Sequence, residues 1–279
     1  MASKKIFPSI FGYLMVGAWV LFTFVLIGWV FFASLSTSGE IFSDHMFKFE
    51  TGFHLENYIK AWRTQRVSVF FMNSLLYTVV SCTAIVLIAA PAAYTLTRFR
   101  FPGSALIQNM FAAALGIPVI MIIMPLFGLV SALRLTNKRW VLMFLYTAMN
   151  VPFAIFYLLA FFRNLSFTYE EAAAIDGCPP IKTFWMIMLP LVQPGIVTVT
   201  IFNFITIWNE YFMSLIFANK TAVRPVAVGL YSMIQSMRYT GDWGGMFAAV
   251  VIVFLPTFLL YIFLSEKIIA GVTSGAIKG

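Results

Sequence analysis

The sequence predicts an all-α integral membrane protein with six transmembrane helices, and two observations support this prediction. First, 61% of the 279 residues are hydrophobic and only 10% are charged, whereas about a quarter of the residues in a soluble domain are charged. Second, six long stretches contain at most one charged residue each, and each is long enough to cross a hydrocarbon core, which takes roughly 20 residues. Because backbone groups in lipid must bond within their own segment, these stretches should be helices.

The first predicted span follows Lys4 and Lys5, as the apolar part of a signal peptide would. Its apolar run is too long for a signal peptide and no small-residue cleavage site follows, so we predict a retained helix. We expect the whole chain to form one transmembrane domain. In chain order, the predicted spans are 11–33, 69–96, 104–132, 141–162, 192–217 and 244–265.

The formal net charge of +8 does not indicate a nucleic-acid partner, because the basic residues are scattered between apolar runs and form no basic stripe. The expected surroundings are a lipid bilayer. Cys82, Cys178, His45 and His54 have no spacing that predicts a disulfide or a metal site. Six spans put both termini on one side of the membrane, but the basic residues divide too evenly between the two sides to identify it.

The segment 163–190, between the fourth and fifth predicted spans, has the pattern of a helix that begins with a cap. Thr168 and Glu171 have the spacing of a capping box, in which each side chain bonds a backbone amide of the other residue. Glu170 and Glu171 lie in the predicted first turn, where carboxylates favour the positive end of the helix dipole. Capping alone predicts a surface helix between two spans.

The same segment also has the pattern of a turn and a second helix. Gly177 suits the left-handed residue that follows a helix. The second helix can begin at Pro179 or Pro180, since proline is tolerated in a first turn. It should end near Pro190, whose ring breaks the hydrogen-bond ladder.

This loop resembles the signature loop of permeases of ATP-binding-cassette importers. The pattern of that family is Glu-Ala-Ala, three residues, Gly, nine residues and then Ile-x-Leu-Pro. Here three residues separate Ala173 from Gly177, and nine separate Gly177 from Ile187. Cys178 and Pro179 depart from the Ala-Ser pair that many relatives have after the glycine, which removes a capping hydroxyl. The matching residues, with the acids beside them, are Glu170, Glu171, Ala172, Ala173, Asp176, Gly177, Ile187, Met188, Leu189 and Pro190.

The resemblance implies the fold of type I importer permeases (MetI-like), in which this loop is cytosolic and docks into a cleft on an ATPase subunit. It implies a coupling helix over 171–177 with its turn at Gly177, and both termini in the cytoplasm. Ser, Thr and glycine-rich residues at the C-terminal end resemble the tail that contacts the ATPase pair in relatives, which points to Gly275 and Lys278. Composition alone would make this tail a solvated end.

Four further segments resemble the carbohydrate branch, specifically maltose-type second permease subunits. They are LENY at 55–58, YTLTRF at 94–99, WNEY at 208–211 and the tail at 271–279. The resemblance covers nearly the whole chain and implies a sugar cargo, most simply an oligosaccharide. The same branch includes glycerol-phosphate carriers, and an importer of another small solute stays open.

A polar stripe is expected on one face of the fifth span. At about 100° per residue, its members fall within an arc of roughly 120°, and Glu210 is the only Asp, Glu, Lys or Arg within a predicted span. The stripe could line a translocation path for sugar hydroxyls, or it could form hydrogen bonds between helices. Both interpretations remain open at this stage. The stripe consists of Thr200, Asn203, Thr206, Glu210 and Ser214.

No phosphate-binding GxxxxGK[ST] sequence occurs, so we predict no enzymatic activity and no cofactor in this chain. By resemblance, ATP and magnesium bind on two separate ATPase subunits. The other implied partners are a second permease subunit, which makes a heterodimer, and an extracytoplasmic sugar-binding protein. The implied location is the cell membrane. A stand-alone secondary transporter or a membrane protein without transport activity would leave the loop at 163–190 unexplained.

Overall fold

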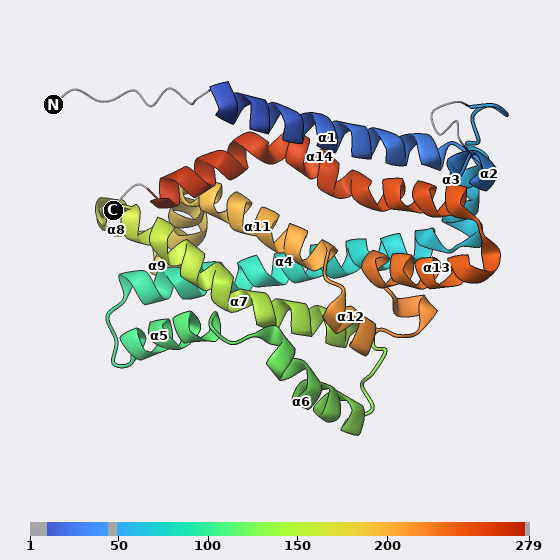
Figure 1. Cartoon of the computed structure of the whole chain (residues 1–279). Coiled ribbons are helices and arrows are strands. Elements are labelled where there is room, and N and C mark those ends of the chain that lie inside the picture. The colour runs from blue at the N-terminus through green and yellow to red at the C-terminus, as the bar shows by residue number, and fades with distance from the viewer. Residues whose placement is uncertain (1–9, 44–48, 277–279) are drawn as a thin grey trace. The chain divides into compact units, whose positions relative to one another are not determined.

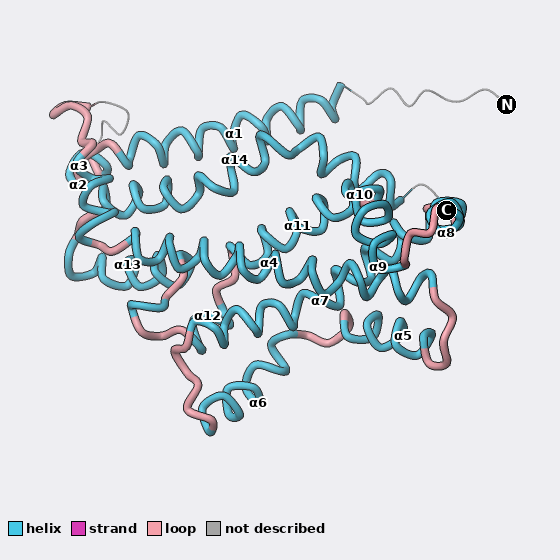
Figure 2. The backbone as a smooth tube through the Cα atoms, turned by 180° about the vertical axis from the view of Figure 1, so that it is seen from behind, coloured by secondary structure: helices cyan, strands magenta, loops and turns pink. Residues whose placement is uncertain are grey.

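The structure is a computed structural model that describes residues 10–43 and 49–276. Every element within these ranges is helical (Figure 2). In chain order the elements are α1 (Ile10–Ser34), α2 (Ser38–Ile41), α3 (Glu56–Ile59), η1 (Lys60–Thr64), α4 (Val67–Arg98), α5 (Ser104–Ala114), α6 (Val119–Ala132), α7 (Arg139–Asn164), α8 (Thr168–Ile175), α9 (Pro180–Thr183), η2 (Phe184–Met188), α10 (Leu189–Leu191), α11 (Gln193–Trp208), α12 (Phe212–Phe217), η3 (Thr221–Val223), α13 (Val226–Thr240) and α14 (Trp243–Ala276).

The predicted membrane-spanning architecture is confirmed. Four single helices have the length and hydropathy of a membrane span: α1, α4, α7 and α14. Two further candidates are bent helix pairs, so the described residues supply six spans when each pair counts as one. Predicted spans 11–33, 69–96, 141–162 and 244–265 lie within single helices.

The third predicted span, 104–132, is not one continuous helix. It consists of α5 and α6, which meet at an angle of 97° (Figure 1). Pro118 lacks a backbone N–H, and its ring disfavours helical geometry at Ile117. Gly116 adds a residue with low helix propensity directly before them. Pro125 lies inside α6 without such a break, so it is the combination of three residues that ends α5.

The fifth predicted span, 192–217, is also interrupted. The segment Pro180–Leu191 meets α11 at an angle of 74°, and Pro194 lies in the first turn of α11. The second helix of the loop includes the π-helical segment η2 and ends at Leu191, next to its predicted end near Pro190. A further break at 209–211 separates α11 from α12.

The chain forms two compact units, each of which is discontinuous in sequence. The first contains residues 1–68 and 230–255, and the second contains residues 69–229 and 256–279. The expectation of one transmembrane domain over 1–279 stays a prediction.

The first unit is held together at one end by a buried amide. The Asn57 side chain donates hydrogen bonds to the carbonyl oxygens of Ser34 and Ser36, at 3.1 and 2.9 Å. A Cβ atom on Gly244 would lie 2.5 Å from the Ser36 carbonyl oxygen. Only glycine therefore lets the start of α14 approach the end of α1 this closely. A small apolar core lies beside these contacts, formed by Ala61, Val67, Met233, Ala248 and Ala249.

Glu40 closes a capping box at the start of α2. Its Oε2 accepts a hydrogen bond from the Thr37 backbone N–H at 2.8 Å, and its Oε1 accepts one from the Thr51 backbone N–H at 2.9 Å. These hydrogen bonds lower the pKa of the Glu40 carboxyl from 4.5 to about 2. The bond from the Thr37 backbone N–H is the largest cause, and the hydrogen bonds from Thr51 add to it. The carboxylate therefore connects α2 to the chain at Thr51 in its charged form.

We expect Glu40 to make the stability of the protein depend on pH in the acid range. Because its folded-state pKa is lowered, its contribution is complete above pH 4.5 and disappears as the pH falls towards 2. The difference in thermal midpoint between the wild type and Glu40→Gln should be largest at neutral pH and shrink over this window. Glu56→Gln is the matched control, since the Glu56 side chain is 64% exposed. A constant difference between pH 7 and pH 3 would contradict the assignment.

The second unit contains the larger core, which is built mainly from α4, α7, α11 and the segment 184–192. Tyr77 on α4 is buried and its hydroxyl donates to the Val223 carbonyl oxygen at 2.8 Å. The Asn73 amide donates to the carbonyl oxygens of Ala222 and Arg224, each at 3.0 Å. Helix α4 is therefore fixed to the connection between α12 and α13, with the predicted coupling loop held at the opposite end of the same unit.

Candidate functional site: the loop 163–190 and the polar residues of the fifth span

Helix α8 ends in the left-handed turn that the sequence predicted. Gly177 has a φ of 73°. Its N–H donates to the Ala174 carbonyl oxygen at 3.0 Å, and the Cys178 N–H donates to the Ala173 carbonyl oxygen at 2.8 Å. These two bonds form a Schellman motif, which satisfies carbonyl groups at the end of the helix.

The predicted capping box at the start of α8 is wrong. The residue before the helix is Phe167, whose side chain makes no capping hydrogen bond. The Ser166 hydroxyl oxygen accepts a hydrogen bond from the Thr168 N–H at 3.2 Å, and the two hydroxyl groups also contact each other. Since Ser166 caps from further upstream, the Glu171 side chain is left free of a capping role.

Most of α8 faces away from the rest of the chain. Ala173 is buried, whereas Glu171, Ala172 and Asp176 are exposed and Ile175 is 86% exposed. An exposed isoleucine beside carboxylates, on a helix with little side-chain bulk, forms a surface that another protein can approach closely. The signature residues on α8 are thus mostly exposed, whereas Ile187, Met188 and Leu189, further along the loop, pack into or against the core.

The second helix of the loop begins at Pro180, one of the two predicted positions, and Pro179 precedes it in extended geometry. The Thr183 N–H donates to the Pro179 carbonyl oxygen at 2.9 Å. Phe184 and Met188 are buried in the main core, while Ile187 and Leu189 are half-buried against it and Pro190 is exposed. The loop is therefore fastened to the core immediately after its exposed helix.

Arg98, the last residue of α4, was not predicted as a site residue but makes three contacts with this loop. Its Nε lies 2.8 Å from Glu170 Oε1. Its Nη2 donates to the Leu165 carbonyl oxygen at 2.9 Å, and its guanidinium lies 4.3 Å from the centre of the Phe167 ring. The segment YTLTRF at 94–99 contained the residue, but nothing in a linear pattern pairs it with Glu170, 72 positions later.

The five residues of the predicted polar stripe do not share one helix face. Thr200, Asn203 and Thr206 lie on α11, whereas Glu210 follows its end and Ser214 belongs to α12. The periodicity argument assumed a continuous helix, and the break at 209–211 removes that assumption. Thr200 is half-buried, and Thr206 is exposed.

Glu210 lies at the break and its carboxylate accepts hydrogen bonds from two elements. Oε1 accepts from the Met213 N–H at 2.6 Å, and Oε2 accepts from the N–H and the hydroxyl of Ser214 at 3.0 and 2.8 Å. Oε2 also accepts from the Tyr146 hydroxyl on α7 at 2.9 Å. Glu210 therefore caps α12 and fixes it to α7, the arrangement expected from the hydrogen-bonding interpretation of the stripe.

Asn203 has hydrogen-bonding capacity that the protein does not use. Its side chain is buried, and its Nδ2 has no hydrogen-bond partner in the described part of the chain. A buried donor without a partner is costly, by about 1–3 kcal/mol. A buried water is consequently the partner that suits this unused donor.

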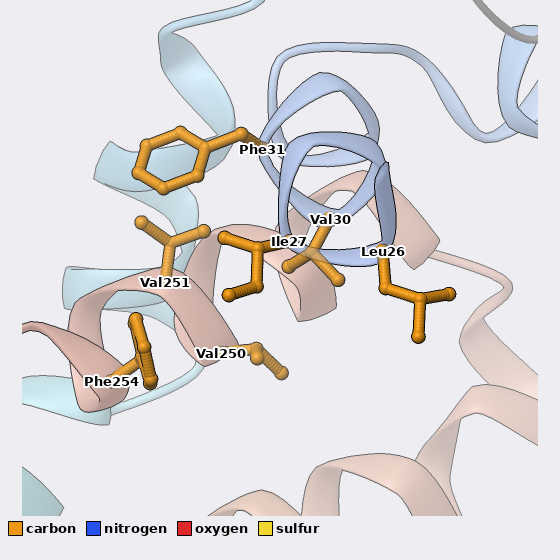
Figure 3. A pocket seen from close by; sticks show the side chains of 7 residues that line it. All are labelled: Leu26, Ile27, Val30, Phe31, Val250, Val251 and Phe254. Carbon is orange, nitrogen blue, oxygen red and sulfur yellow. The ribbon is translucent and has the colours of Figure 1, made fainter. Parts of the chain in front are cut away.

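An apolar groove in the first unit is not suited to a polar cargo. Figure 3 shows side chains of α1 and α14 around a cavity of about 180 Å³. All of its lining residues are apolar: Leu26, Ile27, Val30, Phe31, Val250, Val251 and Phe254. A sugar site needs polar groups placed to bond hydroxyls, and this groove provides none.

The predicted contact of the C-terminal tail with the ATPase subunits stays a prediction. Gly275 lies within α14, and Lys278 lies outside the described residues. Within residues 10–43 and 49–276, His, Cys, Asp and Glu side chains form no group of three that could hold a metal ion.

Comparison with known proteins agrees with the loop and the fold. Residues 84–268 match the family described as the binding-protein-dependent transport system inner membrane component. A diacetylchitobiose uptake system permease protein of Streptomyces coelicolor is 34% identical over 93% of this chain and 86% of its own. A trehalose transport system permease protein of Mycobacterium tuberculosis is 30% identical over 90% and 91%. A trehalose/maltose transport system permease protein of Thermococcus litoralis is 31% identical over 81% of each chain.

The fold is also that of a solved importer. One chain of a bacterial ABC transporter involved in the import of the acidic polysaccharide alginate superposes with a TM-score of 0.80 at 21% identity, covering 95% of this chain and 98% of that one. The family match covers well over half of the chain, and it includes the exposed helix, the Gly177 turn and the Arg98 contact. The protein therefore belongs to the family of inner-membrane components of binding-protein-dependent transport systems.

Proposed function

We propose that this chain is one of two permease subunits of an ATP-driven importer whose cargo is an oligosaccharide. The observation that carries the proposal is α8, an exposed helix with the family's signature residues that ends in a Schellman turn at Gly177. The chain hydrolyses no ATP. Two separate ATPase subunits bind ATP and magnesium, and an extracytoplasmic sugar-binding protein delivers the cargo to the permease pair.

The ATPase subunit docks on the exposed side of α8. Glu171 and Asp176 offer carboxylates to basic groups of the partner, and Ile175 inserts into its cleft. The inward residues Ile187 and Leu189 pass the movement to the core, against which they pack. This arrangement puts the loop and both termini in the cytoplasm, and Gly275 and Lys278 next to the ATPase pair.

Import follows alternating access. Closure of the ATPase pair on ATP displaces the docked helices, and the membrane helices change from an inward-open to an outward-open arrangement. Thr200 and Thr206, which reach the surface of α11, contact the cargo or its water, and the unused amide of the buried Asn203 bonds a water on the same helix. Glu210 and Ser214 border the same region but fix α12 in place.

An oligosaccharide is the favoured cargo because the relatives named above are permeases for diacetylchitobiose, trehalose and trehalose/maltose. A disaccharide or longer sugar offers many hydroxyl groups and no charge, which suits a membrane region with uncharged polar side chains. Glycerol phosphate is the alternative cargo. It would need a basic group in the path, and the stripe contains only uncharged residues and Glu210.

Uptake of labelled sugars by membranes that contain the whole complex tests the proposal. We expect uptake of a malto- or chito-oligosaccharide, or of trehalose, that requires both ATP and the binding protein. Complex without binding protein is the control. Labelled glycerol phosphate, offered in parallel, distinguishes the two cargo classes. A wild-type chain that purifies without an ATPase in mild detergent, or that transports solute without ATP, would contradict the proposed class.

A further inference from the structure

One buried charged pair connects α4 to helix α8, while Tyr94 of α4 packs against Phe184 further along the loop. The side chain of Arg98 is 4% exposed and that of Glu170 is 18% exposed. Both carboxylate oxygens of Glu170 are buried, and neither accepts a hydrogen bond from the described residues. The attraction of Arg98 therefore compensates the burial of this carboxylate, and removal of either partner would leave an uncompensated buried charge.

Apolar packing does not replace this pair. An open cavity of about 250 Å³ lies between the end of α4 and the loop, with Tyr94, Arg98 and Phe99 on one side and Phe167, Glu170 and Ala174 on the other. Dispersion and burial contribute little across such a gap, because facing atoms are missing. The guanidinium of Arg98, which contacts Glu170, Phe167 and the Leu165 carbonyl group, is thus the direct link between α8 and α4.

Helix α4 extends this link across the membrane. Its 32 residues correspond to a length of about 48 Å. At its other end, Asn73 and Tyr77 bond the backbone of residues 222–224, between α12 and α13. A displacement of Arg98 along the helix axis would therefore reach a connection on the far side of the second unit.

We propose that Arg98 is a positioning residue for energy coupling: it makes α4 follow the movement of α8 when the ATPase subunit pulls on that helix. This inference rests on the proposed function. It adds a path by which the movement of α8 reaches α4, which the signature loop alone does not provide. In this route, Glu171 and Ile175 contact the ATPase, and Glu170, one residue away, contacts α4 through Arg98.

Three variants of the complete importer test the route: Glu170→Gln, Arg98→Met and the double variant. The readout is the ratio of sugar taken up to ATP hydrolysed in proteoliposomes. We expect each single variant to lower this ratio about fivefold or more, as for an allosteric coupling energy in the usual range. The double variant should lower it no further, because residues that act as one pair are not additive.

Arg100→Met is the matched control. Arg100 is exposed, lies two positions after Arg98 and has the same charge, so the ratio should stay at the wild-type value. If Arg98→Met does not assemble with its partners, Arg98→Lys replaces it. Lysine keeps the charge but lacks the planar group for Phe167 and the donor arrangement for Leu165, so its ratio should lie between those of the wild type and Glu170→Gln.

Two results would overturn the inference. One is a wild-type ratio in assembled Glu170→Gln or Arg98→Lys complexes, and the other is additive losses in the double variant. Both leave the proposed function intact, since the wild-type complex would still import its sugar. Failure of the wild-type complex to retain an ATPase would contradict the proposed function and this inference together.

Discussion

Replacement of Gly177 by aspartate is expected to abolish most sugar uptake while ATP hydrolysis by the complex continues. Gly177 has a φ of 73°, and beyond its two neighbours in sequence no atom of the described residues lies within 4 Å of where a Cβ would be. The subunit itself can therefore accommodate a side chain at this turn, at a strain of about 1–2 kcal/mol. The added carboxylate would face the docked ATPase subunit next to Asp176, where bulk and repeated negative charge both oppose contact. Uptake and hydrolysis are measured on the same proteoliposomes.

Two control variants separate strain from docking. Gly103 also has a positive φ, of 91°, with no atom within 4 Å of a Cβ, so Gly103→Asp introduces the same strain outside α8 and should retain uptake. Gly177→Asn has the size of aspartate without its charge and tolerates the left-handed region. An intermediate loss with asparagine would assign part of the effect to charge. Normal uptake with Gly177→Asp would contradict the docking of α8.

Replacement of Glu210 by alanine is expected to cause the largest loss of stability among the residues of the fifth span. The Met213 and Ser214 backbone N–H groups would lose their acceptor in a region without bulk water. Each unsatisfied buried donor costs about 1–3 kcal/mol, so the two donors together predict a loss of about 2–6 kcal/mol. The thermal midpoint of the purified complex in detergent measures it.

The adjacent residue provides the control. The Asn209 side chain is exposed and bonds only the Ile205 carbonyl oxygen within α11, so Asn209→Ala should shift the midpoint little. Glu210→Gln keeps one acceptor oxygen and should fall between alanine and the wild type. A Glu210→Ala complex with a normal midpoint but without uptake would instead make Glu210 a cargo-contacting residue.

The features that could be predicted from the sequence are those that depend only on residues close to one another along the chain. Apolar stretches predicted where the membrane helices lie, because lipid requires about the same hydrophobic length from any sequence. Gly177 predicted the end of α8, because a left-handed residue is a local requirement. Helix α8 begins at Thr168, but the predicted Thr168–Glu171 capping box was wrong, since the Ser166 hydroxyl oxygen accepts the Thr168 N–H instead.

Broken helices were less accessible to sequence reasoning. Pro118 and Pro125 both lie in the third predicted span, yet only the former ends a helix. The neighbouring Gly116 and Ile117 make the difference, because Gly116 has low helix propensity and Pro118 disfavours helical geometry at Ile117. The stripe on the fifth span failed for the same reason, because one break at 209–211 changes the direction of every later residue.

By itself the sequence determined the all-helical membrane class, the position of the signature loop and the family to which the chain belongs, because hydropathy and a spaced signature are read along the chain. Only the tertiary structure decided which polar groups already have partners. It assigned Glu210 to Tyr146 and Ser214, left the Asn203 amide without a partner among the described residues, and paired Arg98 with Glu170. The Tyr146–Glu210 and Arg98–Glu170 pairs join residues 64 and 72 positions apart, and the attraction between such groups depends on distance in space, which a linear pattern does not contain.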